Sequence, residues 1–392
     1  MSPYFSAIPT AETEIGLALE ATRGVPATPT AWFKVMGPKY KPDLQLLPDE
    51  TLQGSMVKTY DEIPGLRYDS HGWDQNLYLD SFPMLVRAEL GSTDNITVAP
   101  ANTTMTVASA AGATTITTAG AVATGSWIVI DTGVGVIETR QVLVGGTSPT
   151  FTYPLAFAHA QGATITGLTG HAFSLLNNSN STGNQPPSYT ISDYGGDTWR
   201  ELAACQLDEL SINISADALP KVTTTWFCNQ ALQPSTEAAV FSPTEAAPGW
   251  TTVCAVGGTQ LGYVVSADTS LKRGVKNIPA ITGNQNFYQH FAAELVATGK
   301  LTVLQDPSAV QLSSYESGTA ESFDLTLFDV YQGMAINIHS TKFKYTTGEI
   351  DRSKEYVEVP LDIEFLPTST DALAGGVSPV KITVANLTSQ SY

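Results

Sequence analysis

The chain has 392 residues and carries 19 lysines and arginines against 37 aspartates and glutamates, a formal net charge of −18 at pH 7. A chain of that sign repels phosphates, so composition excludes a protein that holds nucleic acid by counterion release. Only 14% of residues are charged while 42% are hydrophobic, which favours a Thr-rich β protein or a subunit that buries much of its surface against copies of itself.

The N-terminal region and the cysteines predict a protein that is made and folded in the cytoplasm. No basic region followed by an apolar run opens the chain, and no stretch approaches about 18 apolar residues, so we expect neither a signal peptide nor a membrane span. Cys205, Cys228 and Cys254 form no CxxC motif. Each lies in a mostly apolar or Thr-rich run, and we expect buried free thiols.

The first 76 residues predict an arm, an extended segment and a long loop. Residues 1–15 are polar and should become ordered only against a partner. An extended segment is expected from Gly16 to Val35. Residues 36–76 are rich in Pro, Gly, Asp and Tyr without a clean period, which predicts a long irregular loop. Its apolar content is too high for a disordered linker, so we expect an ordered contact loop, carried by Tyr40, Tyr60, Ile63, Leu66, Tyr68 and Trp73.

A short helix and a small β domain are predicted next. Ser81 can serve as the N-cap of the helix, Pro83 lies in its first turn, and Gly91 ends it. Residues 93–170 are dominated by Thr, Ala, Gly and Val with almost no charge, which predicts an inserted small β domain. Its short strands are expected at Thr103–Ala108, Thr114–Thr118, Ser126–Asp131, Val136–Val144 and Ala163–Gly167.

Strands with strict alternation dominate the rest of the chain. They are expected at Leu207–Ser215, Leu219–Phe227, Ser322–Leu327 and Val357–Phe365. In the last of these, Val359, Leu361 and Ile363 share one face, while Glu358, Asp362 and Glu364 share the other. This period predicts a sheet with a buried side and an acidic, wetted side.

The last third of the chain carries three further signals. Asp306 as N-cap, Pro307 at the first helical position and Gly318 as stop predict a second short helix. The change of parity between Ile338 and Phe343 predicts a β-bulge near Ser340. A Gly-Gly pair at residues 375 and 376 predicts a hinge before a detachable terminal strand.

Taken together, these segments predict a mostly β protein, a sandwich or barrel with one or two short flanking helices and a small all-β insertion. The predicted divisions are an N-terminal arm at 1–15, a core domain at 16–92 and 171–368, an inserted domain at 93–170 and a C-terminal arm at 369–392. No solenoid-type internal repeat is visible in the sequence.

Catalytic chemistry is not predicted. The five histidines, at positions 71, 159, 171, 290 and 339, have no ligand spacing, so we expect no metal and no cofactor. The carboxylate pairs Asp208–Glu209, Glu358–Asp362 and Asp362–Glu364 could in principle serve a glycosidase. Because the polar faces around them carry Ser and Thr rather than aromatic platforms, a solvated acidic face is the better interpretation.

The N-terminal run from Ile15 to Val35 resembles the opening of major tail tube proteins of long, non-contractile-tailed (siphovirus-type) bacteriophages. The run Leu46–Ser55, the helix ending at Leu90–Gly91, the run Thr298–Val303 and the β-rich stretch Phe323–Phe365 are similar to that family in order and style. The resemblance covers about residues 16–91 and 171–367. It implies two packed sheets with a flanking helix, six subunits that join inner sheets into a ring, and rings that stack into a tube.

The resemblance also implies a role and partners. The protein would be a non-enzymatic structural subunit of the virion, assembled in the host cytoplasm, that contacts itself, the tape measure protein, the tail terminator and distal tail proteins, with no membrane. DNA would pass through without specific binding. Loop 36–76 and the two arms would reach the next ring, and the insertion would decorate the outside. The candidates for an acidic lumen wall are Glu209, Asp324, Glu358, Asp362 and Glu364.

Other functions stay open at this point. A tail terminator or capsid decoration protein would stop at a ring or bind only to capsids, whereas a tube subunit forms long polymers. A glycan-binding β protein would fit the Thr-rich strands but needs an export signal. A polysaccharide-degrading enzyme would depend on Glu358, Asp362 or Glu364.

Overall fold

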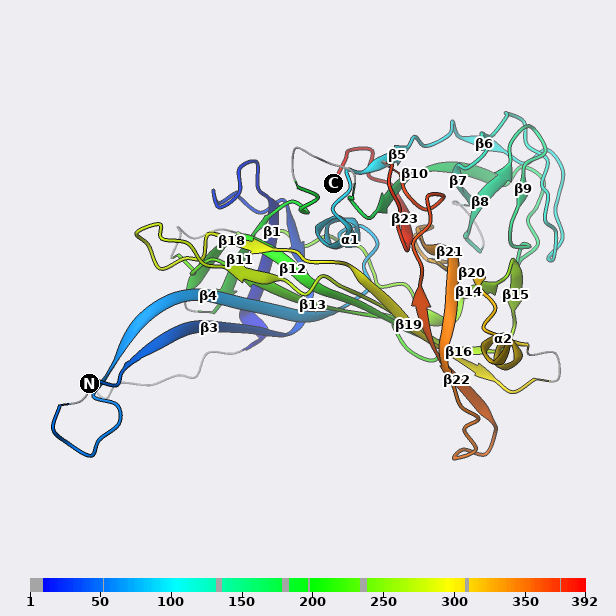
Figure 1. Ribbon diagram of the computed structural model, residues 1–392. Helices are drawn as coiled ribbons and strands as arrows, with labels where there is room; N and C mark the ends of the chain where they lie inside the picture. The colour runs from blue at the N-terminus through cyan, green and yellow to red at the C-terminus, as the bar shows by residue number, and fades with distance from the viewer. Residues whose placement is uncertain are drawn as a thin grey trace, which may run out of the picture.

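The computed structural model describes residues 10–51, 53–131, 136–177, 183–196, 198–232, 238–306, 310–373 and 375–392. Over these residues the chain is mostly β with two short α-helices, which confirms the predicted fold class (Figure 1). None of the described helices has the length and apolarity needed to cross a membrane. The elements are η1 (Thr10–Glu12), β1 (Thr13–Leu19), β2 (Ala31–Phe33), β3 (Val35–Asp49), β4 (Asp61–Asn76), α1 (Phe82–Leu90), β5 (Asn95–Thr97), β6 (Thr103–Thr104), β7 (Trp127–Ile130), β8 (Glu138–Val144), β9 (Thr150–Phe151), β10 (Thr164–Ser174), β11 (Tyr189–Gly195), β12 (Trp199–Ser215), β13 (Lys221–Cys228), η2 (Gly249–Thr251), β14 (Thr252–Val256), β15 (Thr259–Leu261), β16 (Val264–Lys272), β17 (Lys276–Ile278), β18 (Gln289–Phe291), β19 (Val296–Leu304), α2 (Gln311–Ser317), β20 (Glu321–Phe328), β21 (Ala335–Gly348), β22 (Glu358–Phe365) and β23 (Lys381–Asn386).

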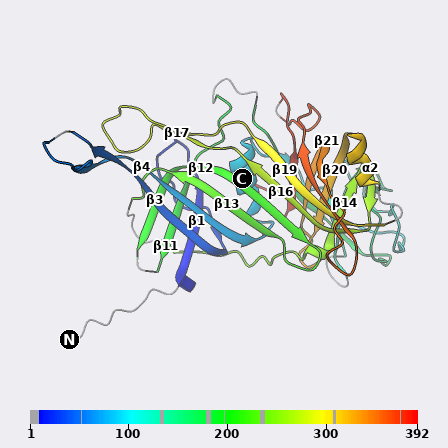
Figure 2. The same ribbon diagram turned by 60° about the horizontal axis from the view of Figure 1, so that its bottom comes forward.

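A long antiparallel sheet forms the centre of the molecule. Its strand order is β3–β4–β13–β12–β16–β19–β22–β21, and Figure 2 shows most of these strands side by side. The first half of β12 leaves this sheet to pair with β11, which pairs with β1 and then β2. The first half of β21 likewise pairs with β20, which pairs with β14 and then β15. Apolar side chains from both groups and from α1 form one hydrophobic core.

The order and pairing of elements therefore repeats within the chain. The first repeat comprises β1–β4, α1 and β11–β13; the second comprises β14–β16, β19, α2 and β20–β22. Every pairing in the first repeat has a counterpart in the second: β1·β11 matches β14·β20, β13·β4 matches β22·β19, and β3·β4 matches β16·β19. Both helices end at a glycine with positive φ, Gly91 and Gly318.

The irregularities of the ladders repeat as well. In β12, the three steps from Leu202 to Cys205 oppose two steps of β11, and in β21 the three steps from Ser340 to Phe343 oppose two steps of β20. The second of these confirms the bulge predicted near Ser340. Because bulges depend on local geometry rather than on one residue type, the same bulge at the same place shows that the two repeats share one backbone design.

The Thr-rich insertion follows the helix of the first repeat. Its side chains form a separate apolar cluster that includes Met105, Ile128 and Ile165. Strand β10 runs through the predicted boundary at residue 170: it pairs with β7 of the insertion through Leu168 and with β23 from Thr169 onward. A continuous strand ties the insertion to the core, and the division into domains stays a prediction.

The predicted irregular loop at residues 36–76 is wrong for the residues that the structure describes there. They form the hairpin β3–β4, which projects from the body at the lower left of Figure 1. Most of β3 is exposed on both faces, so no alternation was required of its sequence, and Pro42, Pro48 and Pro64 are tolerated in a hairpin of this kind. We call this hairpin the arm.

The C-terminal arm predicted at 369–392 is also wrong. Strand β23 pairs with β10 on one side and β21 on the other, and Ile382 and Val384 are fully buried. Tyr392 packs edge-on against His171 with ring centroids 4.8 Å apart, and its hydroxyl donates to the carbonyl of Asp80 at 2.6 Å. The glycine pair precedes a strand of the core, not a detachable segment.

At the N-terminus, residues 13–15 belong to β1 and not to an arm, and residues 1–9 lie outside the described residues. The helix predicted at Ser81 is confirmed as α1, although the Ser81 side chain makes no capping hydrogen bond. For α2 the N-cap is Val310 and not Asp306, and Pro307 lies outside the described residues. Cys205 and Cys228 face each other at the β12–β13 edge as a disulfide, which corrects the expectation of free thiols; Cys254 is free and buried.

Candidate assembly interface

The long sheet has one face that packs on the core and one polar face that nothing in the described chain covers. Alternation places these faces: along β22, Val359, Leu361 and Ile363 are buried, while Asp362 and Glu364 are exposed. Rows of polar side chains run across several strands at once, because residues in register share a face. One row contains Asp74, Thr223, Ser211, Ser270, Thr298, Glu364 and Lys344.

Three of the predicted acidic residues lie on this polar face, and each is directly opposite a lysine. Glu209 pairs with Lys272, and their charged groups are 3.1 Å apart. Asp362 lies opposite Lys300, and Glu364 opposite Lys344. Lys300 also lies opposite Asp268 on β16, so these strands carry four carboxylates against three lysines, and the face is weakly rather than strongly acidic. That these residues line a lumen stays a prediction.

The other two predicted acidic residues are engaged elsewhere. Glu358 is only 5% exposed, at the end of its strand, and both its oxygens accept from Lys354 at 2.9 Å. Asp324 lies on β20 beneath the insertion, where Tyr153 and Asn337 donate to it at 3.0 and 2.7 Å. Burial alone would raise the Asp324 pKa, but the hydrogen bond and charge of His339 and the hydrogen bond from Tyr153 hold that pKa below its ordinary value. Asp324 thus anchors the insertion, which alternation along one strand could not reveal.

The predicted contact residues of the arm divide into three groups. Ile63 is 55% exposed and lies opposite Leu47, which is 46% exposed. Tyr60 and Leu66 are half-buried. The other predicted contacts are made inside the chain and are corrected here: Tyr40 donates to Asp69, Tyr68 packs on Phe227 and Phe287, and Trp73 stacks on Trp226 in the core.

The long sheet ends in two free edges. On one side β3 pairs only with β4, and no described strand covers its outer edge. On the other side, Phe343–Gly348 of β21 pairs with β22, and the ladder continues past the strand through the bridge between Asp351 and Glu358. No described strand pairs with the outer edge there. Free edges of this kind are templates for another chain.

Sequence analysis missed the side chains along these edges. Lys39 and Lys41 on β3 are exposed, as are Glu349 and Ile350 just beyond β21. A signal was present, because two lysines alternate on one segment and two carboxylates, Glu349 and Asp351, alternate on the other. The sequence alone does not show that these two segments lie at sheet edges, because that depends on the strand order.

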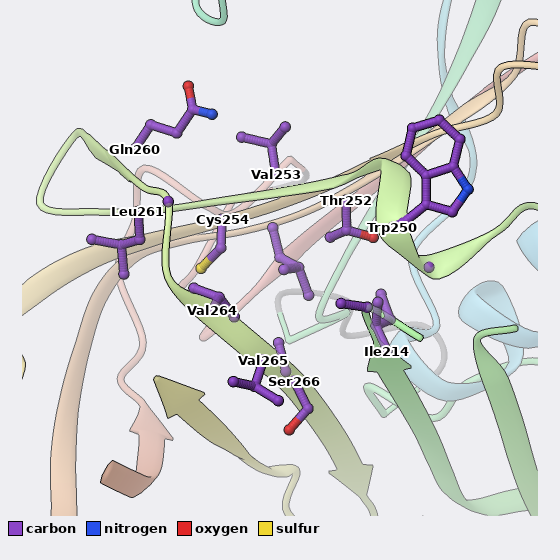
Figure 3. A pocket seen from close by; sticks show the side chains of 15 residues that line it. Ile214, Trp250, Thr252, Val253, Cys254, Gln260, Leu261, Val264, Val265 and Ser266 are labelled. Atoms are coloured by element: carbon purple, nitrogen blue, oxygen red, sulfur yellow. The ribbon is translucent and has the colours of Figure 1, made fainter. Parts of the chain in front are cut away.

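The pocket shown in Figure 3 offers little for catalysis. It has a volume of about 230 Å³ and is lined largely by apolar and uncharged side chains between β14–β15 and the ends of β12 and β16. Its titratable group is Cys254, and burial, followed by the charge of Asp324, raises the pKa of that thiol to about 12. Such a thiol is a poor nucleophile. Among the described residues, no three His, Cys, Asp or Glu side chains gather to hold a metal ion.

Two comparisons bear on this geometry. A family model described as phage tail tube protein matches residues 10–365, which includes both repeats and the insertion within the first of them. A search of the curated proteins finds no match.

Proposed function

Because the chain belongs to the phage tail tube protein family, we propose that it is the repeating subunit of a siphovirus-type tail tube, closing into rings that stack around a DNA conduit. Family membership makes the protein a structural component of the virion tail that assembles with itself and other tail proteins. The finer proposal adds a ring of six sheet units, stacking, assembly in the host cytoplasm, and passage of DNA during ejection.

The observation that carries the proposal is the long sheet with a free edge at each end. Edges that stay free in a monomer are a liability, and closure of a sheet into a barrel removes them. The two edges differ in sequence, so copies meet head to tail, and a head-to-tail contact that completes its rotation gives a ring. The polar face, which no described part of the chain covers, would then face the lumen.

The wall proposed here is close to balanced in charge along β12, β16, β19, β22 and β21, because three lysines offset four carboxylates across the strands. A balanced wall lets a polyanion slide, since neither sign dominates and no stripe of lysines holds the phosphates. The arm, with Leu47 and Ile63 exposed, would contact the adjacent ring. The tape measure protein, tail terminator and distal tail proteins are the proposed partners at the inside and the ends of the tube.

Negative-stain electron microscopy of the purified protein at rising concentration tests this function. Hollow tubes with a regular axial repeat are the expected result. Rings that never stack would favour a tail terminator instead, and a protein that stays monomeric at every concentration would contradict the proposal.

A further inference from the structure

The two repeats within one chain are joined by a seam whose register is known. Strand β12 of the first repeat pairs with β16 of the second from Glu209↔Lys272 to Ser215↔Ser266. On the polar side of this seam, Glu209 pairs with Lys272, and the Asn213 amide donates to Asp268 at 2.5 Å. On the core side Ile212 and Thr269 are each 1% exposed. Within one chain, the edge strand of the first repeat is therefore paired and covered by the edge strand of the second.

The free edges at the ends of the long sheet are the counterparts of this seam. In the second repeat, Gly348 lies opposite Leu361 and Asp351 opposite Glu358, as Leu210 lies opposite Thr224 and Asn213 opposite Lys221 in the first. The counterparts of Leu210, Ser211, Ile212 and Asn213 are thus Gly348, Glu349, Ile350 and Asp351.

The same comparison makes β3 of the first repeat the counterpart of β16 in the second. Lys39 lies opposite Gly72, and Asp268 lies opposite Lys300; Gly72 and Lys300 are themselves counterparts through β13 and β22. The counterparts of Asp268, Thr269 and Ser270 are thus Lys39, Tyr40 and Lys41.

We propose that residues 347–351 of one chain pair antiparallel with residues 39–43 of a second copy, in the register of the internal seam, so that six sheet units are closed by three chains. This register sets Glu349 opposite Lys41 and Asp351 opposite Lys39. It also sets Ile350 opposite Tyr40 on the core side. The inference rests on the proposed tube function for the number six, while the register rests on the chain's own internal seam.

Two observations identify a second copy as the occupant of these edges. The charges are complementary: the two carboxylates on one edge meet the two lysines of the other, and within one chain Lys41 pairs with Asp43 of its own strand. The apolar pattern agrees, because Ile350 is 40% exposed where its counterpart Ile212 is 1% exposed. The exposure of Ile350 at a position that is buried in the other repeat is explained if a neighbouring chain covers it.

Charge reversal tests the seam. One variant carries Glu349→Lys and Asp351→Lys, a second carries Lys39→Glu and Lys41→Glu, and a third carries all four changes. Each double variant places like charges at every seam and should stay monomeric at concentrations where the wild type forms rings, whereas the fourfold variant should assemble again. A matched control, Glu12→Lys with Glu294→Lys, changes two exposed carboxylates in η1 and between β18 and β19 and should assemble like the wild type.

A mixture of the two double variants counts the chains. Opposite charges meet wherever the variants alternate, so the mixture should give heterodimers and open chains by native mass spectrometry. A ring of three cannot alternate and would keep one like-charge seam, whereas a ring of six chains can close. Closed six-chain rings would therefore overturn the count of three.

Rings from either double variant, or a fourfold variant that stays monomeric, would overturn the register while leaving the tube function intact. A wild-type chain that forms no ring at any concentration would instead contradict the proposed function. The two failures are thus distinguishable in one set of samples.

Discussion

At the scale of single residues, the polar groups buried in this chain stabilise it through contacts that no sequence pattern reveals. Arg273, which follows β16, donates from Nε to the carbonyl of Glu89 at 2.9 Å and from Nη2 to that of Leu90 at 3.3 Å, at the C-terminal end of α1. A positive charge is stabilising at the C-terminal end of a helix. The helix of the first repeat is thus held by a residue of the second, so the repeats form one folding unit.

Glu89 supplies a pH-dependent prediction. Its carboxyl is fully buried and has no hydrogen-bond partner among the described residues. Burial, opposed by the charge of Arg273, raises its pKa well above the ordinary value. The folded chain therefore binds this proton more tightly than the unfolded chain, and its stability falls as pH rises from the unfolded pKa towards the raised one. Glu89→Gln removes the titration and should gain about 1–3 kcal/mol over the wild type near neutral pH.

Urea unfolding of both proteins at about pH 4 and about pH 8 checks this expectation. The advantage of the variant should be small at the lower pH and larger at the higher one. A pH-independent difference between the two proteins would show that Glu89 does not titrate as argued.

The cysteines give a second prediction at this scale. With Cys205 and Cys228 paired and Cys254 free, the oxidised protein, denatured and alkylated without reductant, should gain one adduct per chain by mass spectrometry. After reduction it should gain three. Three adducts in both samples would mean that the pair stays reduced, as expected of a protein kept in a reducing cytoplasm.

At the scale of elements, the strands with a buried face were predictable and the arm was not. Val357–Phe365 and Leu207–Ser215 alternate because one side meets the core and the other water. In β3, by contrast, most residues are exposed on both sides, so packing imposes no period. The second repeat was hidden for a related reason: Cys205 and Cys228 in one repeat correspond to Phe343 and Phe365 in the other, and such replacements conserve the backbone while erasing the sequence signal.

The arm carries a prediction of its own. Leu47→Ser with Ile63→Ser removes an exposed apolar pair that, buried against a neighbouring ring, would contribute about 3 kcal/mol, so ring stacking should weaken about a hundredfold. Rings should still close, because neither residue lies at the proposed seam. Tube length measured by electron microscopy is the test.

Val98→Ser with Val107→Ser, two exposed valines of the insertion, is the matched control and should leave tube length unchanged. Long tubes from the Leu47/Ile63 variant would place the ring contact elsewhere.

At the scale of the whole molecule, the candidate lumen could be predicted only in part. Strand alternation identified Asp362 and Glu364 as sharing a polar face, but Lys300 and Lys344, which lie opposite them, come from other strands. Cross-strand neighbours depend on the strand order, which a single sequence does not display. The free edges could not be predicted either, because which strand lies at an edge also depends on the strand order.

The proposed lumen leads to a functional prediction. Asp362→Lys with Glu364→Lys turns a balanced wall positive, so phosphates should be retained and genome ejection from variant virions should slow, while tubes stay intact. Ejection triggered in vitro and followed by DNA release measures this. The variant Glu245→Lys with Glu316→Lys adds the same charge off the polar face, and ejection at wild-type speed from both variants would count against a lumenal position.

The most direct test of the account is a structure of the assembled protein by electron cryo-microscopy. We predict a hollow tube whose rings contain three chains and six sheet units, with the polar face inside and Glu349 of each chain beside Lys41 of the next. A tube whose wall leaves β3 and residues 347–351 facing solvent, or an assembly without a central channel, would contradict it.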